Sequence, residues 1–243
     1  MKTKIASSMM YLFLLVLLPT LFTSCNVIGG VYGDGKVVKE TRAVPSFNEI
    51  DVSGAFHIYL KQGDREEVVL EADDNIMPLI KTTVVGGTLR IGIDQPIRHV
   101  TVLKAYITVK ELKGMDISGA VDLETVNQIT VPELSIDASG ASDSKMEIAV
   151  GRLKLDCSGA SKFRFTGTAT TVDMELSGAS DIFAFELLAE NYNVDISGAG
   201  DARINVSKRI RAEISGAGSI RYKGSPTEID QSVSGAGSIK RAE

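Results

Sequence analysis

The residues whose type and spacing could do chemistry are acids placed around a recurring Ser-Gly-Ala motif. Seven acids lie two residues before a motif serine: Asp51, Asp116, Asp137, Asp156, Glu175, Asp195 and Glu213. A second set follows the motif at Asp122, Asp143, Asp181 and Asp201, with Lys162 between the second and third members. Calcium takes oxygen ligands, so Asp122, Asp143, Asp181 and Asp201 form a candidate calcium site. The alternative, which we favour, is that they are solvated strand residues that accept hydrogen bonds from serine hydroxyls and backbone amides. We therefore predict no bound metal and no cofactor.

The motif serines are the second candidates for chemistry, as nucleophiles. A serine nucleophile needs an activating base, and the chain contains only His57 and His99 to serve eight motif serines. We expect both histidines to lie at the surface. A carbohydrate-processing enzyme would need a basic catalytic residue beside acids, and Arg152, Arg164, Arg203 and Arg221 show no common repeat position in this reading. The sequence therefore predicts no enzyme activity, with a carbohydrate-processing enzyme as the alternative.

The spacing of the motif indicates a repeat architecture. After Ser118 the intervals between motif serines are 21, 19, 19, 20, 18 and 19 residues. A constant period near 20 residues is typical of folds in which each unit buries its apolar side against its neighbours. Glycine after each serine predicts a corner at which the backbone excludes a side chain. The predicted corner residues are Ser118, Gly119, Ser139, Gly140, Ser158, Gly159, Ser177, Gly178, Ser197, Gly198, Ser215, Gly216, Ser234 and Gly235.

Each motif is preceded by alternating apolar and polar residues. Leu153, Leu155 and Cys157 alternate with Lys154 and Asp156, which is the period of a half-buried strand. Each unit then reads as strand, corner, strand and loop. Stacking equivalent strands in register buries the apolar columns and gives parallel ladders, so residues 111–243 predict a parallel β-helix. Cys157 is expected in the core, not as a reactive or metal-binding thiol.

The preceding segment, residues 46–110, is expected to form a cap of antiparallel strands with one short helix, because a solenoid end must be covered. The cap and the coils are expected to form one continuous domain over residues 46–243. Asp73 or Asp74 is expected to cap the helix, which would run to Ile80. Gly86-Gly87 between two strand-like runs predicts a tight hairpin.

The N-terminus predicts export. Residues 1–24 carry Lys2 and Lys4 before an apolar run and read as a lipoprotein signal peptide, with an ordinary signal peptide or a membrane anchor as alternatives. Residues 21–25 resemble a bacterial lipobox, which implies cleavage before Cys25 and lipid attachment there, with membrane contact through that residue. The Gly-rich residues 25–45 are expected to be a flexible tether. Removing two lysines leaves 24 basic and 31 acidic residues, so nucleic acid is not an expected partner.

Several of these features together resemble one family. The lipobox, residues 33–40 (Gly-Asp-Gly-Lys-Val-Val-Lys-Glu), residues 47–55 and the serial Asp-x-Ser-Gly-Ala copies are similar to a domain-of-unknown-function family labelled as an autotransporter adhesin head domain. The resemblance covers about residues 38–240. It implies a right-handed parallel β-helix and a lipid-anchored protein of the Gram-negative outer membrane, facing the periplasm or the surface. It provides no catalytic residues.

The expected function is therefore that of a non-catalytic envelope lipoprotein, an adhesin or binding module for a glycan or an extracellular protein. A purely structural or stress-related envelope component is the remaining alternative, because a fold does not fix a function.

Overall fold

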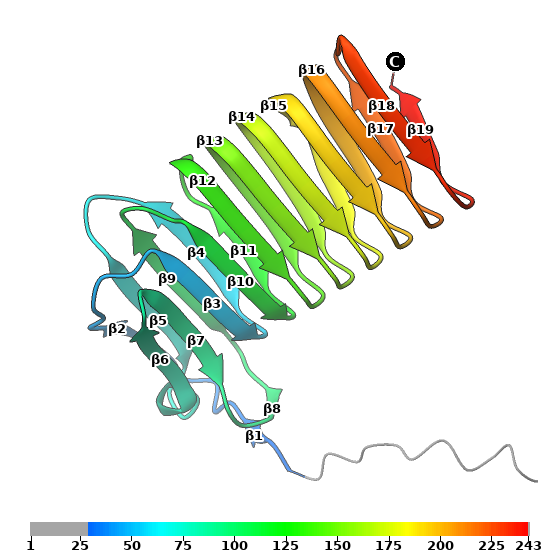
Figure 1. Cartoon of the computed structure of the whole chain (residues 1–243). Helices are drawn as coiled ribbons and strands as arrows, with labels where there is room; N and C mark the ends of the chain where they lie inside the picture. Colours follow the sequence, from blue (N-terminus) through cyan, green and yellow to red (C-terminus); the bar gives the residue numbers. More distant parts are fainter. Residues whose placement is uncertain (1–28, 243) are drawn as a thin grey trace, which may run out of the picture. The chain divides into compact units, whose positions relative to one another are not determined.

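The Ser-Gly-Ala repeats fold into a stack of parallel β-coils (Figure 1). The computed structural model describes residues 29–242, so residues 1–28, including the expected signal peptide and Cys25, lie outside it. The strands of the stack are β10 (Gly114–Gly119), β11 (Asp122–Thr125), β12 (Ile129–Ala138), β13 (Asp143–Cys157), β14 (Lys162–Leu176), β15 (Asp181–Ile196), β16 (Asp201–Ile214), β17 (Ser219–Lys223), β18 (Glu228–Val233) and β19 (Ser238–Arg241). Each pairs in parallel with its equivalent in the next coil, which confirms the predicted parallel β-helix.

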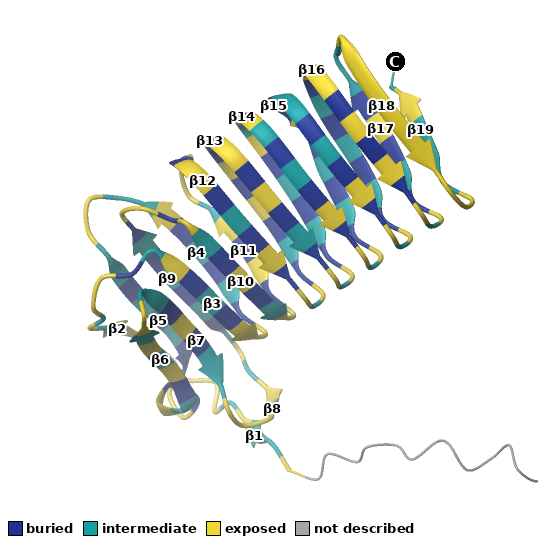
Figure 2. Cartoon of the chain, in the orientation of Figure 1, coloured by how far each residue is buried: buried dark blue, intermediate teal, exposed yellow. Residues whose placement is uncertain are grey.

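Burial follows the alternation read from the sequence. Leu153, Leu155 and Cys157 are at most 1% exposed, whereas the residues between them face outward. The same bands recur on successive strands, so the buried residues form columns that run through the stack (Figure 2). Aliphatic columns removed from water supply the main stabilisation of the coils. No disulfide is needed, and Cys157 is a free buried thiol.

The strands are longer than expected. Strands β13 to β16 have 14 to 16 residues each and run without a break from one corner to the next. The loop expected after the second strand of each unit is therefore absent in these coils. Residues 168–170, for example, lie within β14, and Thr168 pairs with Ala149 and with Leu188. Backbone pairing continues around this bend, so its sequence can vary without a turn motif.

The N-terminal part contains β2 (Val37–Arg42), β3 (Glu49–Gly54), β4 (His57–Gln62), β5 (Glu67–Asp73), β6 (Ile80–Val85), β7 (Thr88–Ile93) and β9 (Leu103–Val109), all in the same sheet, and a small parallel pair, β1 (Val31–Tyr32) with β8 (Ile97–His99). Strands β2, β5 and β9 pair antiparallel, as do β6 and β7, as predicted for a cap. In contrast, β3 and β4 pair in parallel with β10 and β11, so that Ser53 aligns with Ser118. The first coil therefore begins near residue 49, within the segment assigned to the cap.

The tether expected over residues 25–45 also differs from the structure. Strand β2 lies inside that range and pairs with β5 along its whole length. Arg42 donates a hydrogen bond from Nη2 to the carbonyl of Met77 at 3.0 Å. Most of the β2 side chains are polar and only half-buried or exposed, so no apolar alternation marks the strand. It forms because the neighbouring edge offers backbone partners.

The short helix is a single 3₁₀ turn, η1 (Met77–Leu79), with Pro78 in its first turn. Neither expected cap is used, because Asp73 accepts the backbone N–H of Thr101 and Asp74 binds Lys36. The predicted hairpin is present: Gly86 and Gly87 join β6 to β7 with φ values of +63° and +88°, which favour glycine.

The last coil is open on its outer side. All six residues of β18 are exposed, including Ile229 at 52% and Val233 at 45%. Their equivalents one coil earlier, Ile210 and Ile214, are fully buried. Within residues 29–242 no helix has the length and apolarity to cross a membrane.

Candidate functional site

The Ser-Gly-Ala corners are positioned by close contact between coils. A Cβ atom built on Gly140 would lie 2.0 Å from the carbonyl oxygen of Gly119, and Gly159, Gly178, Gly198 and Gly216 meet the preceding glycine in the same way. The alanine after each of these glycines donates its backbone N–H to the coil before it, as Ala141 does to the carbonyl oxygen of Gly119 at 2.8 Å. The motif serines themselves face outward. Their repetition thus reflects how the coils stack.

A second serine column lies inside the corners and was not identified from the sequence. Ser142, Ser161 and Ser180 are at most 4% exposed and occupy equivalent places in three coils. The Ser142 hydroxyl donates to Ser161 Oγ at 3.0 Å, while Ser161 and Ser180 donate to the carbonyls of Gly140 and Gly159. All three serines follow alanine in Ser-Gly-Ala-Ser, a pattern that could have marked them. Their hydrogen bonds satisfy hydroxyls that would otherwise be costly to bury.

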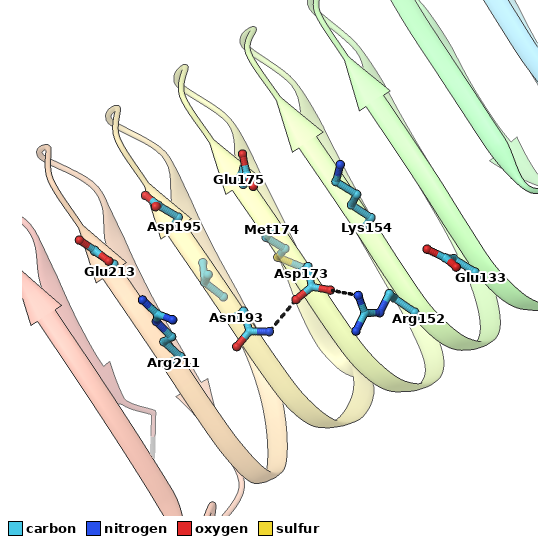
Figure 3. A pocket seen from close by; sticks show the side chains of 11 residues that line it. Glu133, Arg152, Lys154, Asp173, Met174, Glu175, Asn193, Asp195, Arg211 and Glu213 are labelled. Atoms are coloured by element: carbon cyan, nitrogen blue, oxygen red, sulfur yellow. Dashed lines mark hydrogen bonds and ion pairs between the residues drawn. The ribbon is translucent and has the colours of Figure 1, made fainter.

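The acids before the corners stack in register. Asp51, Asp116, Asp137, Asp156, Glu175, Asp195 and Glu213 pair in succession across the coils, as the spacing predicts. We call this column the acid ladder. It borders a depression of about 590 Å³ lined by Glu133, Arg152, Lys154, Asp173, Met174, Glu175, Asn193, Val194, Asp195, Arg211 and Glu213. In Figure 3, Glu175, Asp195 and Glu213 form a row over three coils beside this depression.

The floor of the depression is held by polar contacts. Arg152 Nη1 lies 3.6 Å from Asp173 Oδ2, and Asn193 Nδ2 donates to Asp173 Oδ1 at 2.6 Å (Figure 3). Carboxylates and cations thus line an open surface on consecutive coils. Such a surface can hydrogen-bond an extended polar ligand.

Partial burial and the like charges of the acid ladder together raise the pKa of Asp116. Partial burial is the larger cause, followed by the charges of Asp51 and Asp137. A carboxyl whose pKa is higher in the folded state lowers the free energy of unfolding as pH rises through the interval between its unfolded and folded pKa. At neutral pH the ionised Asp116 is therefore unfavourable in the fold.

We expect Asp116→Asn to raise the free energy of unfolding at pH 7 by about 0.5 kcal/mol, since it removes one like charge from the ladder. The gain should disappear at pH 3, where the Asp116 carboxyl, whose pKa is raised, is itself protonated. Urea unfolding at both pH values measures it, with Asp116→Glu as the charge-retaining control. An equal gain at both pH values would show that charge is not the cause.

The candidate calcium residues form a column on the other side of the corners. His57, Asp122, Asp143, Lys162, Asp181 and Asp201 align in that order. Asp143 binds Arg164 at 2.7 Å, Asp201 accepts the Ser219 hydroxyl, and Asp122 lies 3.9 Å from His57 Nδ1. Among residues 29–242, no three His, Cys, Asp or Glu side chains are arranged to hold a metal ion. Lys162 separates the aspartates into two pairs.

His57 is half-buried at the surface, where the sequence placed it. Its two neighbours were not predicted: Asp122 lies beside it, and its ring stacks on that of Tyr59, with ring centroids 4.9 Å apart. His99 is exposed in β8. Cys157 is fully buried, and burial raises the pKa of its thiol to about 12, which keeps it protonated and unreactive at neutral pH.

One further column corrects the sequence reading of the arginines. Lys145, Arg164, Phe183, Arg203, Arg221 and Lys240 align on consecutive coils, so three of the four arginines do share a repeat position. Each residue lies six positions after a motif serine, and counting from that serine would have found the column. Arg152 lies on the other face, and Phe183 interrupts the run of cations.

Comparisons with known proteins agree with this architecture. Residues 46–226 match the model of a family described as "Putative auto-transporter adhesin, head GIN domain". The chain is similar to the crystal structure of a "putative adhesin" from Bacteroides fragilis NCTC 9343, with 30% identity, a TM-score of 0.84 and coverage of 88% of this chain and 100% of that one. A "putative adhesin" and a "putative lipid binding protein" from Parabacteroides distasonis ATCC 8503 share the fold at 24% and 21% identity, TM-scores of 0.71 and 0.68, and the same coverage. A search of curated proteins gives no significant match.

Proposed function

Because the chain belongs to the family of auto-transporter adhesin head GIN domains, we propose that it is a non-catalytic adhesin or binding module of the bacterial cell envelope. The ligand is a glycan or an extracellular protein. It contacts the outward columns of the coil stack, and the depression beside the acid ladder is one such surface. The similarity to the "putative adhesin" from Bacteroides fragilis, which extends over the whole of that chain, supports the proposal.

The observation that carries the proposal is the register of the coils. Equivalent outward residues stand one strand spacing, about 4.8 Å, apart along the stack. A ligand with its own repeat can therefore make the same contact on several coils at once. Weak contacts made together give a much higher overall affinity than one contact alone.

Membrane attachment is the second part of the proposal. Acylation of Cys25 would tie the chain to the outer membrane, and several acyl chains on one residue give stable anchoring. Replacing Cys25 with serine should move the protein out of the membrane fraction. Protease treatment of intact cells should cleave the protein if it is displayed outside; complete protection would contradict an adhesive role.

Ligand binding itself is tested with the full chain purified from membranes in detergent. We expect saturable binding to at least one member of a panel of glycans and extracellular matrix proteins. Parallel measurements with calcium and with chelator show whether the aspartate column takes part. No binding to any member would contradict the proposal and favour a structural envelope role.

A further inference from the structure

The C-terminal coils carry a cluster of cations on the face that follows each corner. Arg203, Arg221 and Lys240 stand above one another in β16, β17 and β19, and Lys223 lies two residues beyond Arg221 on the same face. We call these four residues the basic patch. The neighbouring positions toward the corner are Asp201, Ser219 and Ser238, so the column beside the patch changes from an acid to serines. Neither β17 nor β19 contains an acidic residue.

The basic patch gathers positive charges in a chain that is acidic overall. Acidic residues outnumber basic ones in this chain, with a net charge of −5. Several cations outside the patch pair with acids, as Arg164 does with Asp143 and Arg209 with Glu228. Within residues 29–242, none of the four patch residues forms an ion pair with an acid. Like charges on adjacent strands repel, so this column costs stability unless an anion bridges it.

Aromatic side chains hold two of the four patch cations, Arg203 and Lys223, in place. The Arg203 guanidinium carbon lies 4.4 Å from the centroid of the Phe183 ring, and Arg164 lies 5.3 Å from the same ring. Lys223 Nζ lies 4.5 Å from the centroid of Phe185. Stacking on a ring restricts the guanidinium and leaves its N–H groups available for a planar anion. Phe183 and Phe185 are therefore positioning residues.

We infer that the basic patch binds a linear acidic polysaccharide laid along the coil stack. Carboxylate or sulfate groups match the paired N–H donors of arginine, and the serine hydroxyls beside the cations can bind sugar hydroxyls. The three stacked cations follow a straight line with a spacing of about 4.8 Å. This line suits an extended chain that carries acidic groups at intervals. A flat anionic membrane or duplex DNA would also contact Asp181 and Asp201 on the same face. Because these carboxylates would repel such broad anionic surfaces, we disfavour both as ligands.

This inference rests on the proposed binding function and names the ligand class for one site. It is tested with the full chain in detergent, by binding to immobilised heparin and polygalacturonate, with dextran as the neutral polymer. We expect saturable, salt-sensitive binding to at least one acidic polymer and none to dextran. Double substitution Arg203→Gln and Arg221→Gln should weaken binding about tenfold or more, since two charge-assisted contacts are lost.

The matched control is the pair Lys208→Gln and Arg209→Gln, two cations that pair with acids and lie outside both the basic patch and the depression. It removes the same charge and should change binding less than about twofold. Phe183→Leu should weaken binding without changing the charge, which a purely electrostatic surface would not show. Equal losses in the double variant and its control would overturn the inference. So would binding to anionic phospholipid vesicles or duplex DNA that matches binding to the polysaccharides.

The two proposals fail in different ways. If neutral glycans or matrix proteins bind and the acidic polymers do not, the inference about the basic patch is wrong and the binding function stands. If no member of either panel binds, both are wrong.

Discussion

Replacing Gly198 with valine should destabilise the protein by about 3 kcal/mol or more, because the new side chain has no space at the corner. A Cβ atom at this position would lie 2.1 Å from the carbonyl oxygen of Gly178 and 2.9 Å from that of Ser177. These are backbone atoms that cannot rotate away. The neighbouring coils are joined there by the amides of Ala199 and Ala217, at 3.0 Å each, so moving apart would break hydrogen bonds on both sides.

For a domain of this size the loss corresponds to a fall in melting temperature of roughly 6 to 12 °C, which calorimetry or circular dichroism can follow. Ala199→Val is the matched control, because Ala199 is adjacent to Gly198 but exposed. It introduces the same branched side chain at the same corner. An unchanged melting temperature for Gly198→Val would refute the role of the glycine column.

Truncating Phe163 to alanine should cost about 3 to 5 kcal/mol of unfolding free energy, since it opens a cavity in the middle of the stack. Phe163 is fully buried and stacks on Phe165, with ring centroids 5.6 Å apart. Its neighbours in the column are Ser144 and Ile182. Serine is too small to fill the space left by the ring, so the coils cannot collapse around it easily.

Phe183→Ala is the matched control, because it removes the same side chain one coil further along from an outward-facing position. Its half-buried ring contacts Arg164 and Arg203, and its loss should change the free energy of unfolding by about 1 kcal/mol or less. Urea denaturation of both variants gives the comparison. Similar losses for the two phenylalanines would contradict the assignment of inward and outward columns.

The coil stack could be predicted because its cause is local and repeated. Every copy carries an apolar residue directly before the motif serine, such as Cys157 or Ile196, and strand alternation then fixes which side chains point inward. Register follows from the same repetition, since only one alignment stacks all the glycines. Asp116 therefore meets Asp137, as expected from the spacing alone.

The remaining features depend on contacts between distant residues. Strand β2 has no apolar pattern and forms through pairing with β5, whose residues are more than 25 positions away in every pair. Aspartate is a favoured helix cap, but the carboxylates of Asp73 and Asp74 instead accept hydrogen bonds from the Thr101 amide and the Lys36 ammonium group. The stacked cations were missed because a phenylalanine occupies one coil of their column, and cation–π contacts leave no sequence period of their own.

The open outer side of β18 and the shared register of all coils bear on how such a chain can evolve. A coil contacts only the coil before and the coil after it, and its stability depends on these two interfaces. A duplicated coil would therefore enter the stack with its glycine, serine and acid already aligned. Gain or loss of a gene segment that encodes one coil would therefore change the length of the stack. It would also change the number of contacts available to a ligand, while leaving the cap unchanged.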